Sequence, residues 1–167
     1  MESIYAFLKE RLQGVKRLAV LGAGSVLRSD DAAGMFVVEK LQAAFDTEKY
    51  PNLLFCPGET APENYSGKIR NFCPTHLVVI DAADVGQAPG CVVHIRPEDV
   101  GGPTFCSHML PLRVMIRYLA EETGADVTLL GMQYKSLAFD GVMTQDMRLA
   151  VEKVSGALSR VIRECCA

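Results

Sequence analysis

Two adjacent aspartates, Asp30 and Asp31, follow a glycine-rich stretch that begins at Gly22. The apolar residues 18–21 just before this stretch are typical of a strand buried on both faces of a parallel sheet. After the acids, apolar side chains recur at helical spacing, at Met35, Phe36, Val38 and Leu41. The two carboxylates therefore lie at or just before the start of a helix, where they serve as caps or as ligands.

A third carboxylate follows the most strand-like segment of the chain, residues 76–82. Four consecutive apolar residues in this segment indicate a central strand covered on both sides, and Asp81 stands at its carboxyl end. Ligands of parallel sheets bind outside the carboxyl ends of the strands, where the strand order reverses. If the first and third strands are neighbours, as in the flavodoxin-like order, Asp31 and Asp81 face the same crevice.

A histidine would turn this acidic pair into a metal site, and the chain has three. His76 starts its strand at the edge opposite Asp81, and His94 lies inside a strand-like run, where a hydrogen-bonded residue is commoner than a ligand. His108 precedes a helix, in a loop that can reach the crevice. Two carboxylates and one imidazole suit nickel or zinc and leave coordination positions open.

The glycine-rich stretch and the two aspartates after it exclude two kinds of nucleotide-binding site. Gly22-Ala23-Gly24 begins a dinucleotide fingerprint, but Leu27 replaces its third glycine and the acids would repel a pyrophosphate. A phosphate-binding loop would need a Gly-Lys-Ser/Thr ending. Cys106, two residues before His108, raises a thiol-nucleophile alternative, which we disfavour because no nearby group would orient the imidazole.

The amino-acid composition limits the classes of protein to which this chain can belong. The 167 residues fit one domain, 1–167, and 49% hydrophobic with 22% charged residues is a globular composition. A net charge of -3 gives no basic footprint for nucleic acid. No apolar run approaches the roughly 18 residues of a membrane span, so we expect no membrane insertion and a cytoplasmic protein. The six scattered cysteines, among them Cys56 and Cys91 in strand-like runs, are expected to be reduced and mostly buried.

Strand-like and helical segments alternate along the chain. Strands are predicted at residues 18–21, 53–56, 76–82, 91–95 and 127–131. Helices are predicted at residues 1–13, to about 45, 62–72, 109–124, and after Thr144 to the end. This alternation predicts an α/β fold, a three-layer αβα arrangement with a mostly parallel, twisted sheet of about five strands and helices on both faces.

Local signals refine these elements. Pro57-Gly58 is expected to end the second strand, Thr60 and Glu63 to form a capping box, and Asp30 to cap the helix behind it. Thr144 is a plausible cap for the last helix. The helical spacing of four side chains predicts that they pack in the core, namely Met35, Phe36, Met115 and Met147.

Three motifs in this order resemble the hydrogenase maturation endopeptidases. They are G-x-G-[SN]-x-L-x-x-D-[DE]-x-x-G at residues 22–34, V-I-D-A at 79–82 and S-H-x-x-P-L at 107–112. Members of this family remove a C-terminal extension from the large-subunit precursor of [NiFe] hydrogenases. Residues 58–64 and 130–133 resemble the branch that serves formate-hydrogenlyase-type hydrogenases.

The resemblance implies a function for each of the three site residues. Asp31 and Asp81 match the family's metal-contacting acids, and His108 matches its histidine. Nickel is then carried by the large-subunit precursor, the implied partner, and need not be a resident cofactor. A water activated at the site cleaves the chain, and which group acts as its base is left open. At Cys56-Pro57 the sequence departs from relatives that often carry Asp-Gly.

Two other functions are alternatives to a protease. A non-catalytic nickel-binding or metallochaperone module would employ the same three ligands without cleavage. A small-molecule-binding α/β domain would instead have a crevice that no carboxylate faces.

Overall fold

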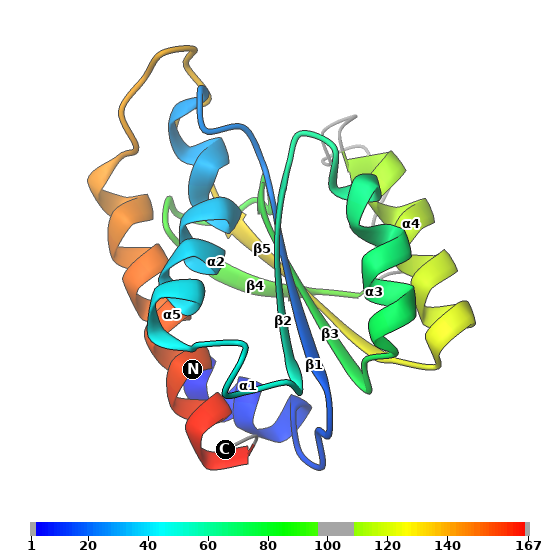
Figure 1. The fold of residues 1–167 in the computed structure, drawn as a ribbon. Coiled ribbons are helices and arrows are strands. Elements are labelled where there is room, and N and C mark those ends of the chain that lie inside the picture. Colours follow the sequence, from blue (N-terminus) through cyan, green and yellow to red (C-terminus); the bar gives the residue numbers. More distant parts are fainter. Residues whose placement is uncertain (1–2, 97–108, 166–167) are drawn as a thin grey trace.

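A single twisted sheet forms the centre of the computed structural model, which describes residues 3–96 and 109–165, with 109–111 described by backbone alone (Figure 1). Within these residues the strand order is β2-β1-β3-β5-β4. The strands are β1 (Leu18–Ala23), β2 (Leu53–Glu59), β3 (His76–Ala83), β4 (Val92–Ile95) and β5 (Asp126–Gln133). All neighbouring pairs are parallel except β4 with β5, which confirms the mostly parallel sheet. The first and third strands are neighbours, which is the condition under which Asp31 and Asp81 were expected to face one crevice.

Helices cover both faces of this sheet, as predicted for an αβα fold (Figure 1). One face carries α1 (Ile4–Arg11), α2 (Ala33–Ala44) and α5 (Gln145–Cys165). The other carries α3 (Ser66–Phe72) and α4 (Met109–Thr123). The period of two in each strand divides the core between these layers, because alternate side chains point to opposite faces. In the described residues, no helix is long and apolar enough to cross a membrane.

The β1 strand shows this division most clearly. Leu18 and Val20 pack in the core beneath α1, α2 and α5, whereas Ala19 and Leu21 pack in the core beneath α3 and α4. All four side chains are fully buried. The continuous apolar run therefore does what the sequence pattern indicated, since a strand covered on both sides needs apolar residues at every position.

Two predicted element boundaries are wrong. The second strand continues through Pro57 to Glu59, because β2 is an edge strand of the described sheet, and proline is tolerated there. The helix predicted from residue 62 is divided into a 3₁₀ turn, η2 (Pro62–Tyr65), and α3. Ala61 holds the N-cap position of η2, so the expected capping box of Thr60 and Glu63 does not form.

The predicted packing of single side chains is mostly confirmed. Met35, Met115 and Met147 are buried as expected, and the Cys56 thiol is buried. Phe36 is exposed because it follows Met35 on α2 by about a quarter turn, which moves it off the buried face. Cys91, beside the edge strand β4, and Cys73 are exposed, and Cys165 is partly buried, so among the described cysteines the prediction of mostly buried thiols is wrong.

Candidate functional site

A pocket of about 570 Å³ opens at the carboxyl ends of β1, β2 and β3. Asp31 and Asp81 both line it, so the structure brings together the two acids that the sequence analysis selected. His108 lies outside the described residues. The pocket is lined by Ala23, Gly24, Ser25, Arg28, Asp31, Glu59, Thr60, Pro62, Asp81, Ala82, Leu112, Tyr134 and Leu137.

The glycine-rich turn holds Asp31 in place. Gly24 has φ of +124°, a conformation that side chains rarely adopt, and a Cβ there would overlap the Asp31 backbone carbonyl. The turn directs the Ser25 backbone N–H at the Asp31 side chain, and it donates to Oδ2 at 2.9 Å. One carboxylate oxygen of Asp31 is thereby oriented by the backbone.

A second glycine brings the two acids to the same place. Gly34, in the first turn of α2, packs directly against the end of β3, and a Cβ on it would overlap the Ile80 carbonyl oxygen. Ile80 precedes Asp81. Only a residue without a side chain lets the start of α2, and Asp31 with it, approach the carboxyl end of β3 this closely.

Asp81 is nearly buried, and its environment opposes its negative charge. Burial, together with the negative charge of Asp31, raises the pKa of the Asp81 carboxyl from 3.8 to about 7, and a backbone hydrogen bond involving Ala82 opposes this rise. Near neutral pH a substantial share of the Asp81 carboxyls therefore carries a proton. A cation placed between the two carboxylates would displace that proton, because opposite charge favours the ionised form.

Asp30 has a different role from the helix cap that we predicted. Ala32 holds the N-cap position of α2, and the fully buried Asp30 side chain points into residues 134–144, the loop between β5 and α5. Its Oδ2 accepts from the backbone N–H groups of Lys135 (2.9 Å) and Ser136 (3.2 Å). Thr144 donates its N–H to Oδ1 (2.7 Å) and its hydroxyl to Oδ2 (3.0 Å). Asp30 thus anchors the loop that supplies Tyr134 and Leu137 to the pocket.

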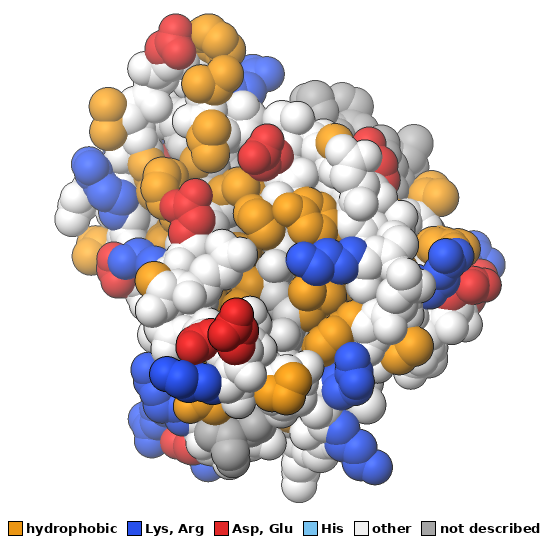
Figure 2. All heavy atoms as spheres, viewed as in Figure 1, with side chains coloured by type: hydrophobic (Ala, Val, Ile, Leu, Met, Phe, Trp, Pro, Cys, Tyr) orange, Lys and Arg blue, Asp and Glu red, His pale blue; other side chains and the backbone are white. Residues whose placement is uncertain are grey.

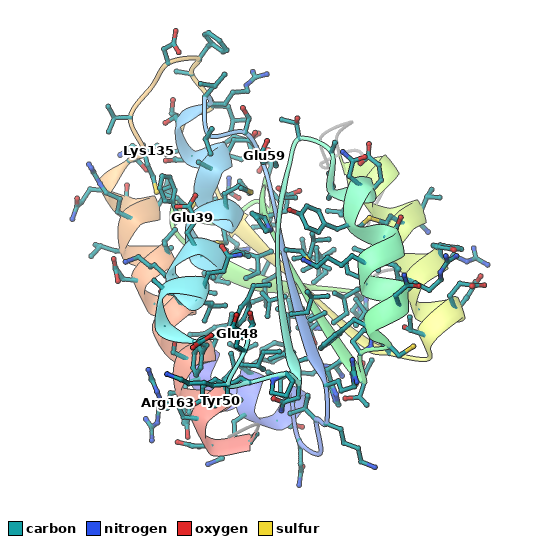
Figure 3. All side chains as sticks on the ribbon, viewed as in Figure 1. Glu39, Glu48, Tyr50, Glu59, Lys135 and Arg163 are labelled. Carbon is teal, nitrogen blue, oxygen red and sulfur yellow. The ribbon has the colours of Figure 1, made fainter. Side chains whose placement is uncertain are left out.

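Glu59 is a third acid at the pocket that the sequence analysis missed. It ends β2, at the same end of the sheet as the start of α2 (Figure 3). Its backbone carbonyl accepts from the Gly24 N–H at 2.9 Å, which ties it to the glycine-rich turn. Because Pro57-Gly58 was expected to end the second strand, the predicted strand stopped short of the pocket.

The described residues alone do not complete a metal centre. No group of three or more His, Cys, Asp or Glu side chains in this part of the chain could hold a metal ion. His76 lies at the amino end of β3, as expected, where its Nδ1 contacts the Thr75 hydroxyl at 3.1 Å. The exposed His94 packs against Phe7 in a tilted arrangement, with ring centroids 5.1 Å apart. Asp31 and Asp81 are two carboxylates at one pocket, and a metal bound there would need further ligands from elsewhere.

Comparison with known proteins agrees with these motifs. A family model described as HycI, hydrogenase maturation protease, matches residues 35–161. The chain is 36% identical to the hydrogenase 3 maturation protease of Escherichia coli over 136 residues, which cover 81% of this chain and 84% of the relative. It is 30% identical to a putative hydrogenase maturation protease of Methanocaldococcus jannaschii over 161 residues, 94% of this chain and 95% of that one.

The fold is shared with a solved member of that group. The crystal structure of the [NiFe] hydrogenase maturation protease HycI from Thermococcus kodakarensis superimposes with a TM-score of 0.86 and 29% identity, covering 94% of this chain and 99% of the other. The family model spans most of the chain, including β2, β3, β5 and most of α2. The chain belongs to the hydrogenase maturation proteases, a family of endopeptidases, and to their HycI branch.

Proposed function

We propose that this endopeptidase removes the C-terminal extension of a [NiFe] hydrogenase large-subunit precursor after nickel insertion. Asp31, Asp81 and His108 recognise the nickel that the precursor carries. The observation that supports this proposal is the convergence of Asp31 and Asp81 on one pocket at the carboxyl edge of the sheet. Membership in the hydrogenase maturation proteases supplies the class of reaction.

The donor set suits a metal that arrives with the substrate. Two carboxylates leave most coordination positions of nickel to other ligands, which the precursor and His108 supply. The pocket of about 570 Å³ has room for a peptide segment beside the metal. A site of this kind recognises a loaded precursor and rejects an empty one, because only the loaded precursor offsets the repulsion between the two acids.

The proton on Asp81 connects recognition to chemistry. Without a cation the pKa of this carboxyl is about 7. A bound cation would favour its ionised form, so its proton would pass to solvent, and a carboxylate oxygen not occupied by the cation could accept a proton from water. Asp31 is oriented by the Ser25 amide and is the second group within the pocket that can take this role. Both carboxylates are therefore proposed to act on the attacking water as well as on nickel.

Processing of the precursor tests the proposal. Wild-type protein incubated with nickel-loaded precursor should shorten it, and nickel-free precursor should stay full length. Asp31→Asn and Asp81→Asn should each slow processing at least about 100-fold, the usual scale for losing a general acid or base. Glu39→Gln, an isosteric change on the exposed side of α2, is the matched control and should process normally (Figure 3).

Two outcomes would contradict the proposal. A loaded precursor that stays full length with wild-type protein, while another maturation protease cleaves its own precursor in parallel, would exclude processing. Tight stoichiometric nickel on the isolated protein without cleavage would instead favour a metallochaperone.

A further inference from the structure

Exposed hydrophobic side chains gather at the end of the molecule where the pocket opens. We name them the apolar rim, and they are Val26, Leu27, Phe36, Phe139 and Val142. They come from the loop after β1, from α2, and from the loop before α5. Figure 2 shows hydrophobic side chains over this end of the molecule, at the top of the view. Clustered exposed apolar side chains of this kind mark an interaction surface.

The apolar rim borders a groove of about 440 Å³. Val26, Phe36 and Val142 line it, and Met143 and Val151 lie deeper within it. Polar groups flank the apolar part, including the Lys40 and Glu152 side chains, which form an ion pair at 2.8 Å. An apolar centre with a polar border is the usual layout of a protein–protein contact.

Hydrogen bonds join the two loops that carry most of the apolar rim, the loop after β1 and the loop before α5. The Asp140 N–H donates to the Leu27 carbonyl at 2.8 Å, and the Ser29 hydroxyl donates to the Val142 carbonyl at 2.9 Å. The buried Asp30 carboxylate adds the hydrogen bonds to Lys135, Ser136 and Thr144 described above. These bonds hold the apolar side chains outward, so a partner that binds them need not order the loops first.

The same two loops also line the pocket. Ser25 and Arg28 come from the first loop, and Tyr134 and Leu137 from the second. The loops that carry most of the apolar rim therefore also form one border of the pocket. The parent protein of a segment seated between Asp31 and Asp81 comes to lie next to that border, where the rim can contact it.

We propose that the apolar rim docks the folded body of the hydrogenase large-subunit precursor, through a complementary apolar patch on that protein. This inference rests on the proposed function, because it identifies the occupant from the segment that the pocket takes. Docking on the body of the precursor would let the enzyme bind a folded protein tightly while the acids act only on its C-terminal segment.

Kinetics on the full precursor test this surface. Val142 and Phe139 are 76% and 68% exposed, so Val142→Asp and Phe139→Asp should fold normally. Each should raise KM for nickel-loaded precursor about tenfold while kcat stays within about twofold, since a charge would be desolvated in the contact. Val114→Asp, at a side chain 65% exposed on α4 across the sheet, is the matched control and should leave both constants unchanged.

Binding is measured separately so that the two proposals can fail independently. Precursor binding to Asp31→Asn protein, by calorimetry, should weaken about tenfold when Val142→Asp is added. Unchanged KM and unchanged binding in both rim variants would overturn the docking surface, whether or not wild-type protein cleaves. If the rim variant binds the precursor more weakly but wild-type protein does not cleave the precursor, the docking surface is supported and the proposed protease substrate is overturned. A rim variant that only dissociates a homodimer in sedimentation would assign the rim to a second copy and overturn this proposal.

Discussion

At the scale of single residues, neighbouring aspartates with the same chemistry serve different purposes. Asp31 is half-buried and faces the pocket, whereas Asp30 is fully buried and faces the loop before α5. The carboxylate of Asp30 accepts four hydrogen bonds, which compensate its buried charge. The two adjacent acids of the motif therefore differ in position: Asp30 anchors a loop, and Asp31 lines the pocket.

Asp30→Asn should destabilise the fold by about 2–3 kcal/mol, because an amide nitrogen would face backbone donors that now bond to a carboxylate. Urea unfolding measures the loss, and hydrogen exchange should show reduced protection at Lys135, Ser136 and Thr144. Asp31→Asn is the matched comparison and should cost less, since the Asp31 side chain is only partly buried, whereas Asp30 is fully buried. Equal unfolding midpoints for Asp30→Asn and wild-type protein would contradict the anchoring role.

Asp81→Asn should stabilise the protein at pH 8 and have little effect near pH 4. The carboxyl has a pKa of about 7 in the folded protein against 3.8 ordinarily, so the unfolded chain releases its proton first and stability falls as pH rises between these values. The neutral amide removes this penalty, worth roughly 2–4 kcal/mol above pH 7. Urea unfolding at both pH values checks it, and a gain independent of pH would contradict the raised pKa.

At the scale of secondary-structure elements, the site is built by the close approach of α2 to the sheet. The glycine-rich turn after β1 orients Asp31, and Gly34 allows the first turn of α2 to contact the end of β3. The edge strand β2 adds Glu59 from its other side. Three chain segments thus converge because parallel strands end at one edge of the sheet.

Gly34→Ala should disturb this contact. The added methyl group would overlap the carbonyl oxygens of Ile80 and Ala23, which are backbone atoms with little room to move. We expect a loss of about 1–3 kcal/mol in urea unfolding and slower precursor processing, because α2 and Asp31 must shift away from Asp81.

Gly156→Ala is the matched control for that change. Gly156 lies in α5, and among the described residues no atom lies within 4 Å of a Cβ built on it. Alanine should therefore stabilise the helix by up to about 1 kcal/mol and leave processing unchanged. If Gly34→Ala behaved like Gly156→Ala, the close approach of α2 to β3 would not limit the site.

At the scale of the whole molecule, the pocket and the contact between α1 and α5 lie at opposite ends of the sheet. The pocket lies at the carboxyl ends of the central strands, whereas α1 is held on the last turns of α5 (Figure 1). There Glu164 accepts from the Tyr5 hydroxyl at 2.7 Å and pairs with Lys9 at 3.0 Å and Arg160 at 3.1 Å. This separation lets the framework be strengthened without constraining the site.

Glu164→Gln should lower the melting temperature slightly at pH 7 without altering processing. Hydrogen bonds from Tyr5 and Lys9 lower the pKa of Glu164 to about 2, below its ordinary 4.5. The stabilisation is present above pH 4.5 and is lost as pH falls toward 2, so the variant and wild-type protein should converge in acid. Thermal unfolding between pH 2 and 7 checks this, and a constant difference would contradict it.

The predictable part of the fold depended on signals that are local in sequence. Apolar runs identified the buried strands, and Thr144 was correctly predicted as a cap, since the Met147 N–H donates to its hydroxyl at 3.4 Å. Asp31 and Asp81 could be paired from sequence because carboxyl ends of neighbouring parallel strands meet at one edge. The third predicted ligand, His108, lies outside the described residues and stays a prediction.

Tertiary structure alone decided the features that join residues far apart in the chain. The partners of Asp30 lie 105 to 114 residues away, so no local pattern distinguished an anchor from a helix cap. Strand β2 continues through Pro57 to Glu59 because it lies at the edge of the sheet. Pro57 has no backbone N–H, and no described strand on the outer side of β2 needs one. Sequence determined which side chains could do chemistry at this site, and the packing of α2 against the sheet decided which of them reached it.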